Sequence, residues 1–323
     1  MRKVKHIVTS KIKEFALILK DYKLFPSYKN VEPSIVIMFD NKFMHGGLLD
    51  RIKGIITAKM IAEELGYTFK IYADTTTFNL FKFLLPRSEK IVAKKTDLIF
   101  NVWKSKPVVI YNLVKITKQE LIGKFKSQKQ YHLYCNLDLT KRLASFENDE
   151  QYFSFWSNQF FQLFSFNQWF EDYYNKHISA THLCGIHLRF TSLLGDFEEV
   201  ENIPLQQEEK SALIKSCLEK IQQLVLSLAY KKFLVVSDSS SFLNIVKASI
   251  PSTEEKEIII LDGNIGHVDV KHNDEVLQKA ILDFYLLQRC KEIHQVLGYR
   301  MYNSQFSRYA SIAGSSKYLL HKI

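Results

Sequence analysis

An apolar segment that ends in a positive charge is the first place where this sequence could do chemistry. Residues 185–189 read Gly-Ile-His-Leu-Arg and place His187 and Arg189 at the end of a strand-like run. An arginine that emerges from a buried strand is costly unless it meets an anion, and its planar guanidinium suits a diphosphate. The alternative is a structural ion pair with an acid such as Asp196 or Glu198, and spacing alone does not separate the two.

Two more polar segments follow strand-like runs in the second half of the chain. Asp238 comes directly after the apolar residues 232–236, where it could contact a ligand hydroxyl or cap the next helix. Residues 302–308 read Tyr-Asn-Ser-Gln-Phe-Ser-Arg and precede a short helical pattern. The N–H groups of a helix N-terminus and nearby hydroxyls bind phosphate, whereas capping by Asn303 or Ser304 is the structural alternative. The candidate binding residues of this turn are Ser304, Gln305, Phe306 and Ser307.

The first half has one comparable turn, at His45-Gly46-Gly47 and the helix that follows it. Glycines let a ligand approach the backbone, and Asp50 and Arg51 would then face that ligand. The motifs of P-loop nucleotide binding, of serine hydrolases and of zinc peptidases are missing. No Asp-x-Asp pair of the kind that holds a metal with a nucleotide diphosphate occurs either, so we expect no metal site.

Hydrophobic periodicity predicts an alternation of strands and helices that would position these residues. Because ligands bind at the carboxyl ends of parallel strands, the polar residues after each strand should gather at one edge of a sheet. The helix that starts at Leu48 should end at Gly66, a typical C-cap residue. The predicted strands are 35–39, 68–72, 97–102, 108–111, 131–135, 182–190, 232–237, 257–261 and 295–302, and the predicted helices are 48–65, 206–228, 239–247, 274–294 and 304–312.

A length of 323 residues indicates two α/β domains rather than one. An aromatic-rich stretch at 152–174 carries Phe153, Trp156, Phe160 and Phe164 on one helical face, which is typical of core. We place the domain boundary just after it, which predicts domains 1–178 and 179–323 with a cleft between them.

The composition of the chain indicates which kinds of ligand or surface it could bind. The chain is 46% hydrophobic and 24% charged, as in globular proteins, and its net charge of +10 favours phosphorylated ligands or an anionic membrane. No signal peptide and no run of 18 apolar residues is present, so we expect a cytoplasmic protein without a spanning segment. The pattern at 12–25 fits either a helix on an anionic membrane or one packed on the first domain. The four cysteines are expected to be reduced core residues.

Taken in order, these segments resemble the fucosyltransferase superfamily of α1,6-, α1,2- and protein O-fucosyltransferases. Residues 185–189 are similar to its His-x-Arg motif, residues 233–238 to its strand ending in Thr-Asp, and residues 303–308 to its phosphate-binding turn. Asp283 matches an acidic position that contacts the nucleoside in that family, and residues 46–54 resemble its N-terminal Gly-Leu-Gly-Asn-Arg segment.

The resemblance implies a GT-B fold, in which two doubly wound Rossmann-like domains face each other across a cleft. It further implies inverting, metal-independent transfer of fucose from GDP-fucose, bound by the second domain, to a glycan of a surface polysaccharide or glycolipid. Arg189 and the turn at 304–307 would stabilise the leaving diphosphate, and the candidates for the general base are Asp50, Asp196 and Glu198. A nucleotide- or nucleic-acid-binding protein without catalysis is the alternative, although the aromatics do not lie on strands as stacking platforms for nucleic acid would.

Overall fold

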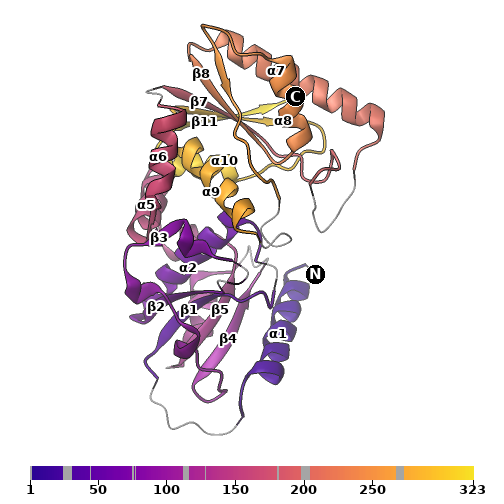
Figure 1. The fold of residues 1–323 in the computed structure, drawn as a ribbon. Helices are drawn as coiled ribbons and strands as arrows, with labels where there is room; N and C mark the ends of the chain where they lie inside the picture. Colours follow the sequence, from indigo (N-terminus) through magenta and orange to yellow (C-terminus); the bar gives the residue numbers. More distant parts are fainter. Residues whose placement is uncertain are drawn as a thin grey trace. The chain divides into compact units, whose positions relative to one another are not determined.

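The computed structural model of the chain describes residues 2–24, 31–43, 45–74, 76, 78–111, 116–127, 129–179, 182–197, 204–266 and 273–323, with side chains from Thr9 onward. Its contacts divide the chain into two compact units, Met1–Ser165 and Phe166–Ile323. Each unit is built on its own parallel sheet, shown in Figure 1.

Unit 1 has a four-stranded sheet in the order β2-β1-β5-β4, with parallel pairing throughout. The central strand β1 is buried along its whole length, which is why its sequence is an unbroken apolar run. The strands are β1 (Ser34–Phe39), β2 (Thr68–Ala73), β4 (Ser105–Ile110) and β5 (Gln130–Cys135); β3 (Leu84–Pro86) and β6 (Phe164–Phe166) form a separate pair. The α-helices are α1 (Arg2–Asp21), α2 (Leu48–Leu65), α3 (Lys118–Ile122), α4 (Thr140–Leu143) and α5 (Asp149–Leu163).

Helix α2 follows the course that its sequence predicts. It starts after Gly47 and ends at Gly66, whose φ of 65° is the left-handed conformation expected of a C-cap glycine. Gly54 lies where the helix crosses β5, and a Cβ there would come within 2.0 Å of the carbonyl oxygen of Cys135. The helix can approach the sheet this closely only because Gly54 has no side chain.

Unit 2 has a five-stranded sheet in the order β11-β10-β7-β8-β9, again all parallel. Its strands are β7 (Leu183–Leu188), β8 (Lys232–Ser237), β9 (Glu257–Ile259), β10 (Glu292–Leu297) and β11 (Lys317–Lys322), and its helices are α6 (Gln168–His177), α7 (Gln207–Ser227), α8 (Ser240–Ser249), α9 (Asp274–Gln288) and α10 (Phe306–Gly314). This strand order is that of a Rossmann-like sheet.

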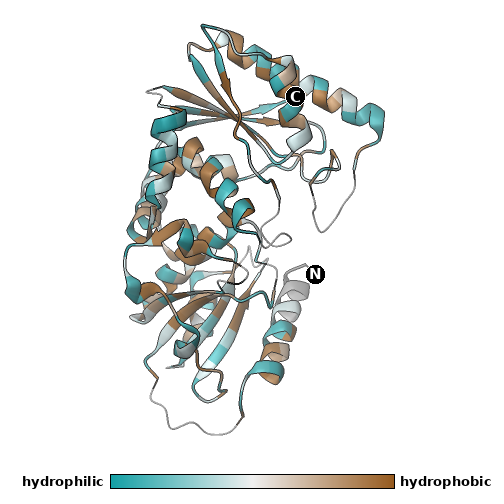
Figure 2. Cartoon of the chain, in the orientation of Figure 1, coloured by the Kyte–Doolittle hydropathy of each residue, from teal (hydrophilic) through white to brown (hydrophobic). Residues whose placement is uncertain are grey.

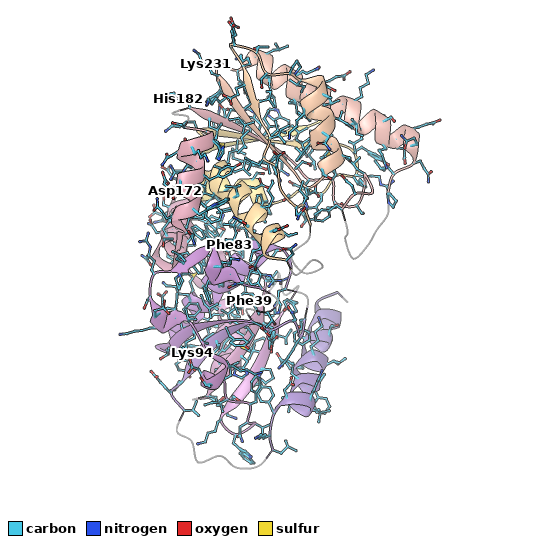
Figure 3. The ribbon with its side chains drawn as sticks, in the orientation of Figure 1. Phe39, Phe83, Lys94, Asp172, His182 and Lys231 are labelled. Carbon is cyan, nitrogen blue, oxygen red and sulfur yellow. The ribbon has the colours of Figure 1, made fainter. Side chains whose placement is uncertain are left out.

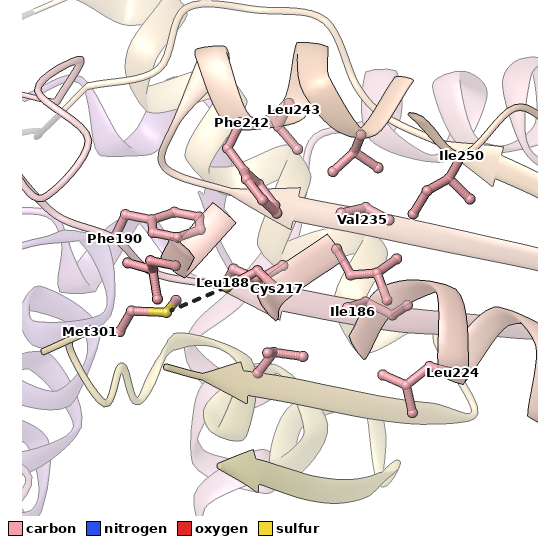
Figure 4. Packing of buried hydrophobic residues seen from close by; sticks show 14 of the residues in the cluster. Ile186, Leu188, Phe190, Cys217, Leu224, Val235, Phe242, Leu243, Ile250 and Met301 are labelled. Atoms are coloured by element: carbon pink, nitrogen blue, oxygen red, sulfur yellow. Dashed lines mark hydrogen bonds between the residues drawn. The ribbon is translucent and has the colours of Figure 1, made fainter. Parts of the chain in front are cut away.

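The helices of unit 2 cover both faces of its sheet. On one face, residues of β7 and β8 pack against α7 and α8 in a continuous core that includes Ile186, Val235 and Phe242 (Figure 4). On the other face α9 approaches β7 so closely that a Cβ on Gly185 would lie 2.9 Å from a methyl carbon of Leu287. In Figure 2 the strands of both sheets are largely hydrophobic, whereas α7 also carries hydrophilic residues.

Three predicted elements need correction. Residues 97–102 are not a strand, because the side chain of Gln130 takes the place of a partner strand: it accepts a hydrogen bond from the Ile99 amide and donates one to the Asp97 carbonyl. The predicted helix 274–294 ends at Gln288. The Lys291 amide then donates a hydrogen bond to the Leu183 carbonyl, and the chain enters β10. This strand begins and ends earlier than the predicted strand 295–302. Strand β11 was not predicted at all.

The aromatic stretch forms two helices, α5 and α6, joined by β6, and Trp156, Phe160 and Phe164 are buried as expected. The contacts divide the chain before α6 rather than at residue 178. The reason is that α6 packs on α9, where Glu171 forms an ion pair with Arg289 and accepts a hydrogen bond from Tyr285.

All four cysteines are free and buried. Among the described residues, no helix combines the length and the apolar character needed to cross a membrane.

Candidate functional site

The best-defined candidate site lies at the point where the strand order of unit 2 reverses. The chain runs from β7 to β8 and β9 on one side of the sheet, and from β10 to β11 on the other. Ligands of open α/β sheets bind outside the carboxyl ends of the two strands that flank such a point. Here these are β7, which Arg189 follows, and β10, which the turn 302–307 follows. Figure 3 labels His182 and Lys231, which precede β7 and β8 and therefore mark the opposite edge.

A ring contact confirms that the two segments are neighbours. The ring centroids of His187 and Phe306 are 5.8 Å apart, although these residues are far apart in sequence. His187 pairs in register with Gln295 of β10, so these two residues lie side by side near the carboxyl ends of the two strands. The structure therefore places the end of β7 next to the turn 302–307.

Arg189 is held by a neighbouring strand and remains partly open to solvent. Its Nε lies 3.2 Å from Oδ2 of Asp238, and its guanidinium carbon lies 4.5 Å from the centre of the Phe197 ring. About a quarter of its side chain, 24%, is exposed. Among the described residues, the acid beside Arg189 is thus Asp238 rather than Asp196. Glu198, the other acid considered from the sequence, lies outside the described residues.

Asp238 organises the loop after β7. One carboxylate oxygen accepts the Phe190 amide at 2.8 Å and the other accepts the Thr191 amide at 2.7 Å. Burial raises the pKa of this carboxyl, and Arg189 together with the two amides opposes that shift. The expected capping role belongs instead to Ser239, whose Oγ accepts the Phe242 amide at 3.1 Å. Asp238 therefore fixes both the arginine and the loop that carries it.

Asp196 has a structural position at the start of α8. Its Oδ2 accepts hydrogen bonds from the hydroxyls of Ser239 and Ser241, at 2.9 and 2.8 Å, and from the Ser241 amide at 2.9 Å. A carboxylate at a helix N-terminus also interacts favourably with the helix dipole. These contacts tie the loop after β7 to α8.

The turn 302–307 is organised by Gln295, which the sequence analysis did not single out. This fully buried side chain accepts hydrogen bonds from the hydroxyls of Ser307, at 3.1 Å, and Tyr318, at 2.6 Å, and its amide lies 3.3 Å from Oδ1 of Asn303. Ser304 accepts the Phe306 amide at 3.2 Å, but the N-cap residue of α10 is Gln305, whose side chain makes no capping hydrogen bond. The signal in the sequence that could have identified Gln295 is a glutamine at a strand position where a buried residue is expected.

His187 is a neutral imidazole in this site. Burial and the positive charge of Arg189 lower its pKa to about 3. Its Nδ1 has no hydrogen-bond partner among the described residues. At neutral pH the ring can therefore offer a hydrogen bond without adding charge beside the arginine.

Asp283 is buried on α9 and paired with a lysine one turn away. Both of its carboxylate oxygens lie 2.6 Å from Nζ of Lys279. Burial raises the pKa of Asp283, and Lys279 opposes the shift. Gly263, in the loop after β9, packs against the stem of Lys279, where a Cβ would come within 3.0 Å. A ligand that hydrogen-bonds to Asp283 must do so while Lys279 also binds the same carboxylate.

The glycine turn of unit 1 lies at the carboxyl edge of that unit's sheet. Gly46 has a φ of 79°, and Gly47 precedes the first residue of α2. Arg51 does not face outward as expected but is fully buried: its Nε donates to the Gly46 carbonyl at 3.2 Å and its guanidinium stacks 3.9 Å from the Phe78 ring centre. Asp50 remains 43% exposed, with Lys53 Nζ at 3.3 Å.

In the described part of the chain, no group of three or more His, Cys, Asp or Glu side chains is arranged to hold a metal ion.

Two Rossmann-like units in one chain define a protein of the GT-B fold class. Solved structures agree: NodZ α1,6-fucosyltransferase soaked with GDP-fucose is similar with a TM-score of 0.50 and 15% identity, over 88% of this chain and 93% of that one. Selenomethionine NodZ from Bradyrhizobium has a TM-score of 0.50 at 14% identity, over 87% and 92% of the two chains. The apo form of POFUT1 has a TM-score of 0.48 at 13% identity, over 92% and 100%.

No protein-family model matches the chain, and no curated protein matches it in sequence. At such low identity the similarity to NodZ establishes the fold. The predicted fold class, an α/β protein of the GT-B type, is confirmed.

Proposed function

We propose that this protein is a glycosyltransferase that transfers fucose from GDP-fucose to a glycan acceptor. The observation that carries the proposal is the contact of His187 with Phe306, which brings the segment that ends in Arg189 next to the turn 302–307 at the switch point of unit 2. A guanidinium and a helix N-terminus side by side suit a diphosphate. The similarity of nearly the whole chain to a fucosyltransferase soaked with GDP-fucose supports the choice of donor.

In the proposed reaction, a hydroxyl of the acceptor attacks the anomeric carbon while the bond from that carbon to the phosphate oxygen breaks. The leaving GDP gains negative charge, which Arg189 and the donors of the turn stabilise more strongly in the transition state than in the ground state. Asp238 positions the guanidinium, and neutral His187 adds a hydrogen bond. Asp283 is proposed to contact the nucleoside, and Ser304, Gln305, Phe306 and Ser307 form the turn that faces the diphosphate.

The proton of the acceptor hydroxyl passes to a carboxylate, for which we propose Asp50. Asp196 is engaged at the start of α8, whereas Asp50 is half-exposed at the carboxyl edge of unit 1, beside Gly46 and Gly47. A single displacement inverts the configuration at the anomeric carbon. We further propose that the reaction needs no metal, because Arg189 and the helix terminus supply the positive charge, and that it builds a surface polysaccharide or glycolipid in the cytoplasm.

Calorimetric titration with GDP, GDP-fucose, GDP-mannose and UDP-sugars tests the donor site. We expect wild-type protein to bind GDP and GDP-fucose, and Arg189→Ala to bind GDP at least tenfold more weakly, since hydrogen bonds to charged groups contribute about 1.5–3 kcal/mol. Arg87→Ala, an exposed arginine of unit 1, is the matched control and should bind as wild type does.

The same preparations report on turnover through slow release of fucose from GDP-fucose in the absence of acceptor. We expect release that persists in EDTA and yields fucose with inverted anomeric configuration. A protein that binds GDP but never releases fucose would be a nucleotide-binding protein without catalysis, and indifference to every nucleotide would remove the proposal.

A further inference from the structure

Helix α1 has an apolar face that the described residues leave largely exposed. Ile12, Phe15 and Leu19 are 62%, 61% and 68% exposed, which is unusual for large apolar side chains of a well-packed unit. Their spacing of three and four residues places them on one face of the helix. We call these three residues the α1 strip.

The opposite face of α1 is firmly attached to unit 1, so the strip is not the result of a loosely docked helix. Leu17 and Tyr22 are buried in a cluster with residues of β1, β4 and β5. The Tyr22 hydroxyl lies 2.7 Å from Nδ1 of His132. Figure 1 shows α1 lying alongside β4, the edge strand of the sheet. The helix therefore presents the strip to the outside in a fixed orientation.

Basic and acidic side chains lie on different faces of α1. Lys11 and Lys20 are exposed and flank the strip on its two sides. The acids of this stretch turn toward the body of the unit, where Glu14 accepts the Val109 amide at 2.9 Å and Asp21 pairs with Lys42 at 2.9 Å. Within residues 9–21, whose side chains are described, the exposed charged groups of the helix are thus all positive.

The apolar surface continues beyond the end of α1. Leu24 and Trp103 are 66% and 61% exposed, and the indole N–H of Trp103 donates to the Leu24 carbonyl at 2.9 Å. A tryptophan whose ring is exposed beside basic residues is typical of the interface between water and lipid. We group these two residues with the strip as one candidate surface of unit 1.

We propose that this surface docks on an anionic lipid bilayer, with α1 lying in the plane of the interface. Apolar side chains between two lysines suit a membrane in which negatively charged headgroups cover an apolar acyl region. The methylene groups of each lysine can lie along the apolar surface while its ammonium group reaches the headgroups. An apolar protein partner would not require positive charge on both sides, and a second copy of this chain would bring lysines against lysines.

The direction of α1 decides which edge of the unit 1 sheet would lie near the membrane. Lys13 lies 5.1 Å from the ring centre of Tyr111, just after β4, whereas Lys23 pairs with Asn101, just before it. The N-terminal half of α1 therefore lies at the carboxyl edge of the unit 1 sheet, the edge that also carries Gly46 and Asp50. If the proposed function holds, an acceptor carried by a lipid would be held next to that edge.

Flotation of the full-length protein with vesicles tests the docking, without donor or acceptor, so its outcome is independent of the proposed enzyme activity. We expect binding to vesicles of phosphatidylcholine with phosphatidylglycerol, and at least tenfold weaker binding to phosphatidylcholine alone or in high salt, which screens the lysines. The triple variant Ile12→Gln/Phe15→Gln/Leu19→Gln and the double variant Lys11→Gln/Lys20→Gln should each weaken binding to the anionic vesicles at least tenfold.

Matched controls use exposed residues of the same kinds in unit 2. Leu226→Gln removes an apolar side chain that is 80% exposed on α7, and Lys231→Gln/Lys291→Gln removes two exposed lysines. Both should float as wild type does, and circular dichroism should show all variants folded. Wild-type protein that fails to float, or control variants that lose binding as strongly as the strip variants, would overturn the proposal. So would self-association of wild-type protein that the triple variant abolishes.

Discussion

Asp238 shows how one buried carboxylate can hold a loop and the arginine of the candidate site at the same time. Its two oxygens accept the amides of Phe190 and Thr191 and also face Arg189. Thr191 has a φ of 54°, a backbone conformation that residues other than glycine adopt rarely, so the loop depends on such contacts.

We therefore predict that Asp238→Asn lowers both stability and GDP affinity. An asparagine cannot accept from both amides, and it leaves Arg189 without its counter-charge. The expected costs are about 1–3 kcal/mol of unfolding free energy and about a tenfold loss of GDP affinity. Asp196→Asn is the matched control: it loses hydrogen bonds at α8 and should be destabilised without a change in GDP affinity. Urea denaturation and calorimetric titration measure the two effects, and unchanged GDP affinity in Asp238→Asn would show that Asp238 does not position Arg189.

At the scale of elements, α10 is placed by a close crossing with the end of α9. A Cβ on Gly314 would lie 1.8 Å from the carbonyl oxygen of Gln288, so only glycine permits this contact. The same helix carries the turn 302–307 at its other end. The position of the proposed phosphate-binding turn thus depends on a glycine at the far end of the helix.

Gly314→Ala should accordingly destabilise the protein by about 3 kcal/mol and weaken GDP binding, because α10 must shift away from α9. Gly123→Ala is a suitable control, since its new Cβ would meet nothing closer than a Lys126 side-chain carbon at 3.7 Å. That variant should change stability by no more than about 1 kcal/mol. Equal stability of the two variants in urea would mean that the crossing is not as tight as the structure has it.

At the scale of the whole molecule, histidines buried in both units make stability depend on pH. Burial lowers the pKa of His45, His132 and His187 to about 3, with Arg51, Lys42 and Arg189 adding to the shift of each in turn. The unfolded chain takes up protons at these histidines near pH 6.5, whereas the folded chain does not. Because the unfolded state binds more protons, stability falls as pH falls below 6.5 toward 3.

Each such histidine should contribute about 1.4 kcal/mol per pH unit to this loss. We predict that His132→Phe loses about 2 kcal/mol less than wild type between pH 7 and pH 5, whatever its stability at pH 7. Urea midpoints at the two pH values provide the measurement, and a His132→Phe profile parallel to that of wild type would contradict the prediction.

The sequence by itself determined most of the main strands and helices and the sheet edge at which to look for a site. Buried strands such as 232–237 and caps such as Gly66 are local signals, because a strand or helix end depends mainly on residues close to it in the chain. The order of strands followed by polar residues was enough to select Arg189, Asp238 and the turn 302–307.

Only the tertiary structure decided what each of these residues touches. That Asp238 rather than Asp196 meets Arg189, that Arg51 is buried against Phe78, and that Gln295 holds the turn are contacts between residues distant in sequence. The side chain of Gln130 likewise bonds to the backbone of residues 97 and 99, where a strand was predicted. The contacts place α6, which packs on α9, in unit 2. Pairings of this kind depend on how sheets and helices pack in three dimensions, which hydrophobic periodicity along the chain does not encode.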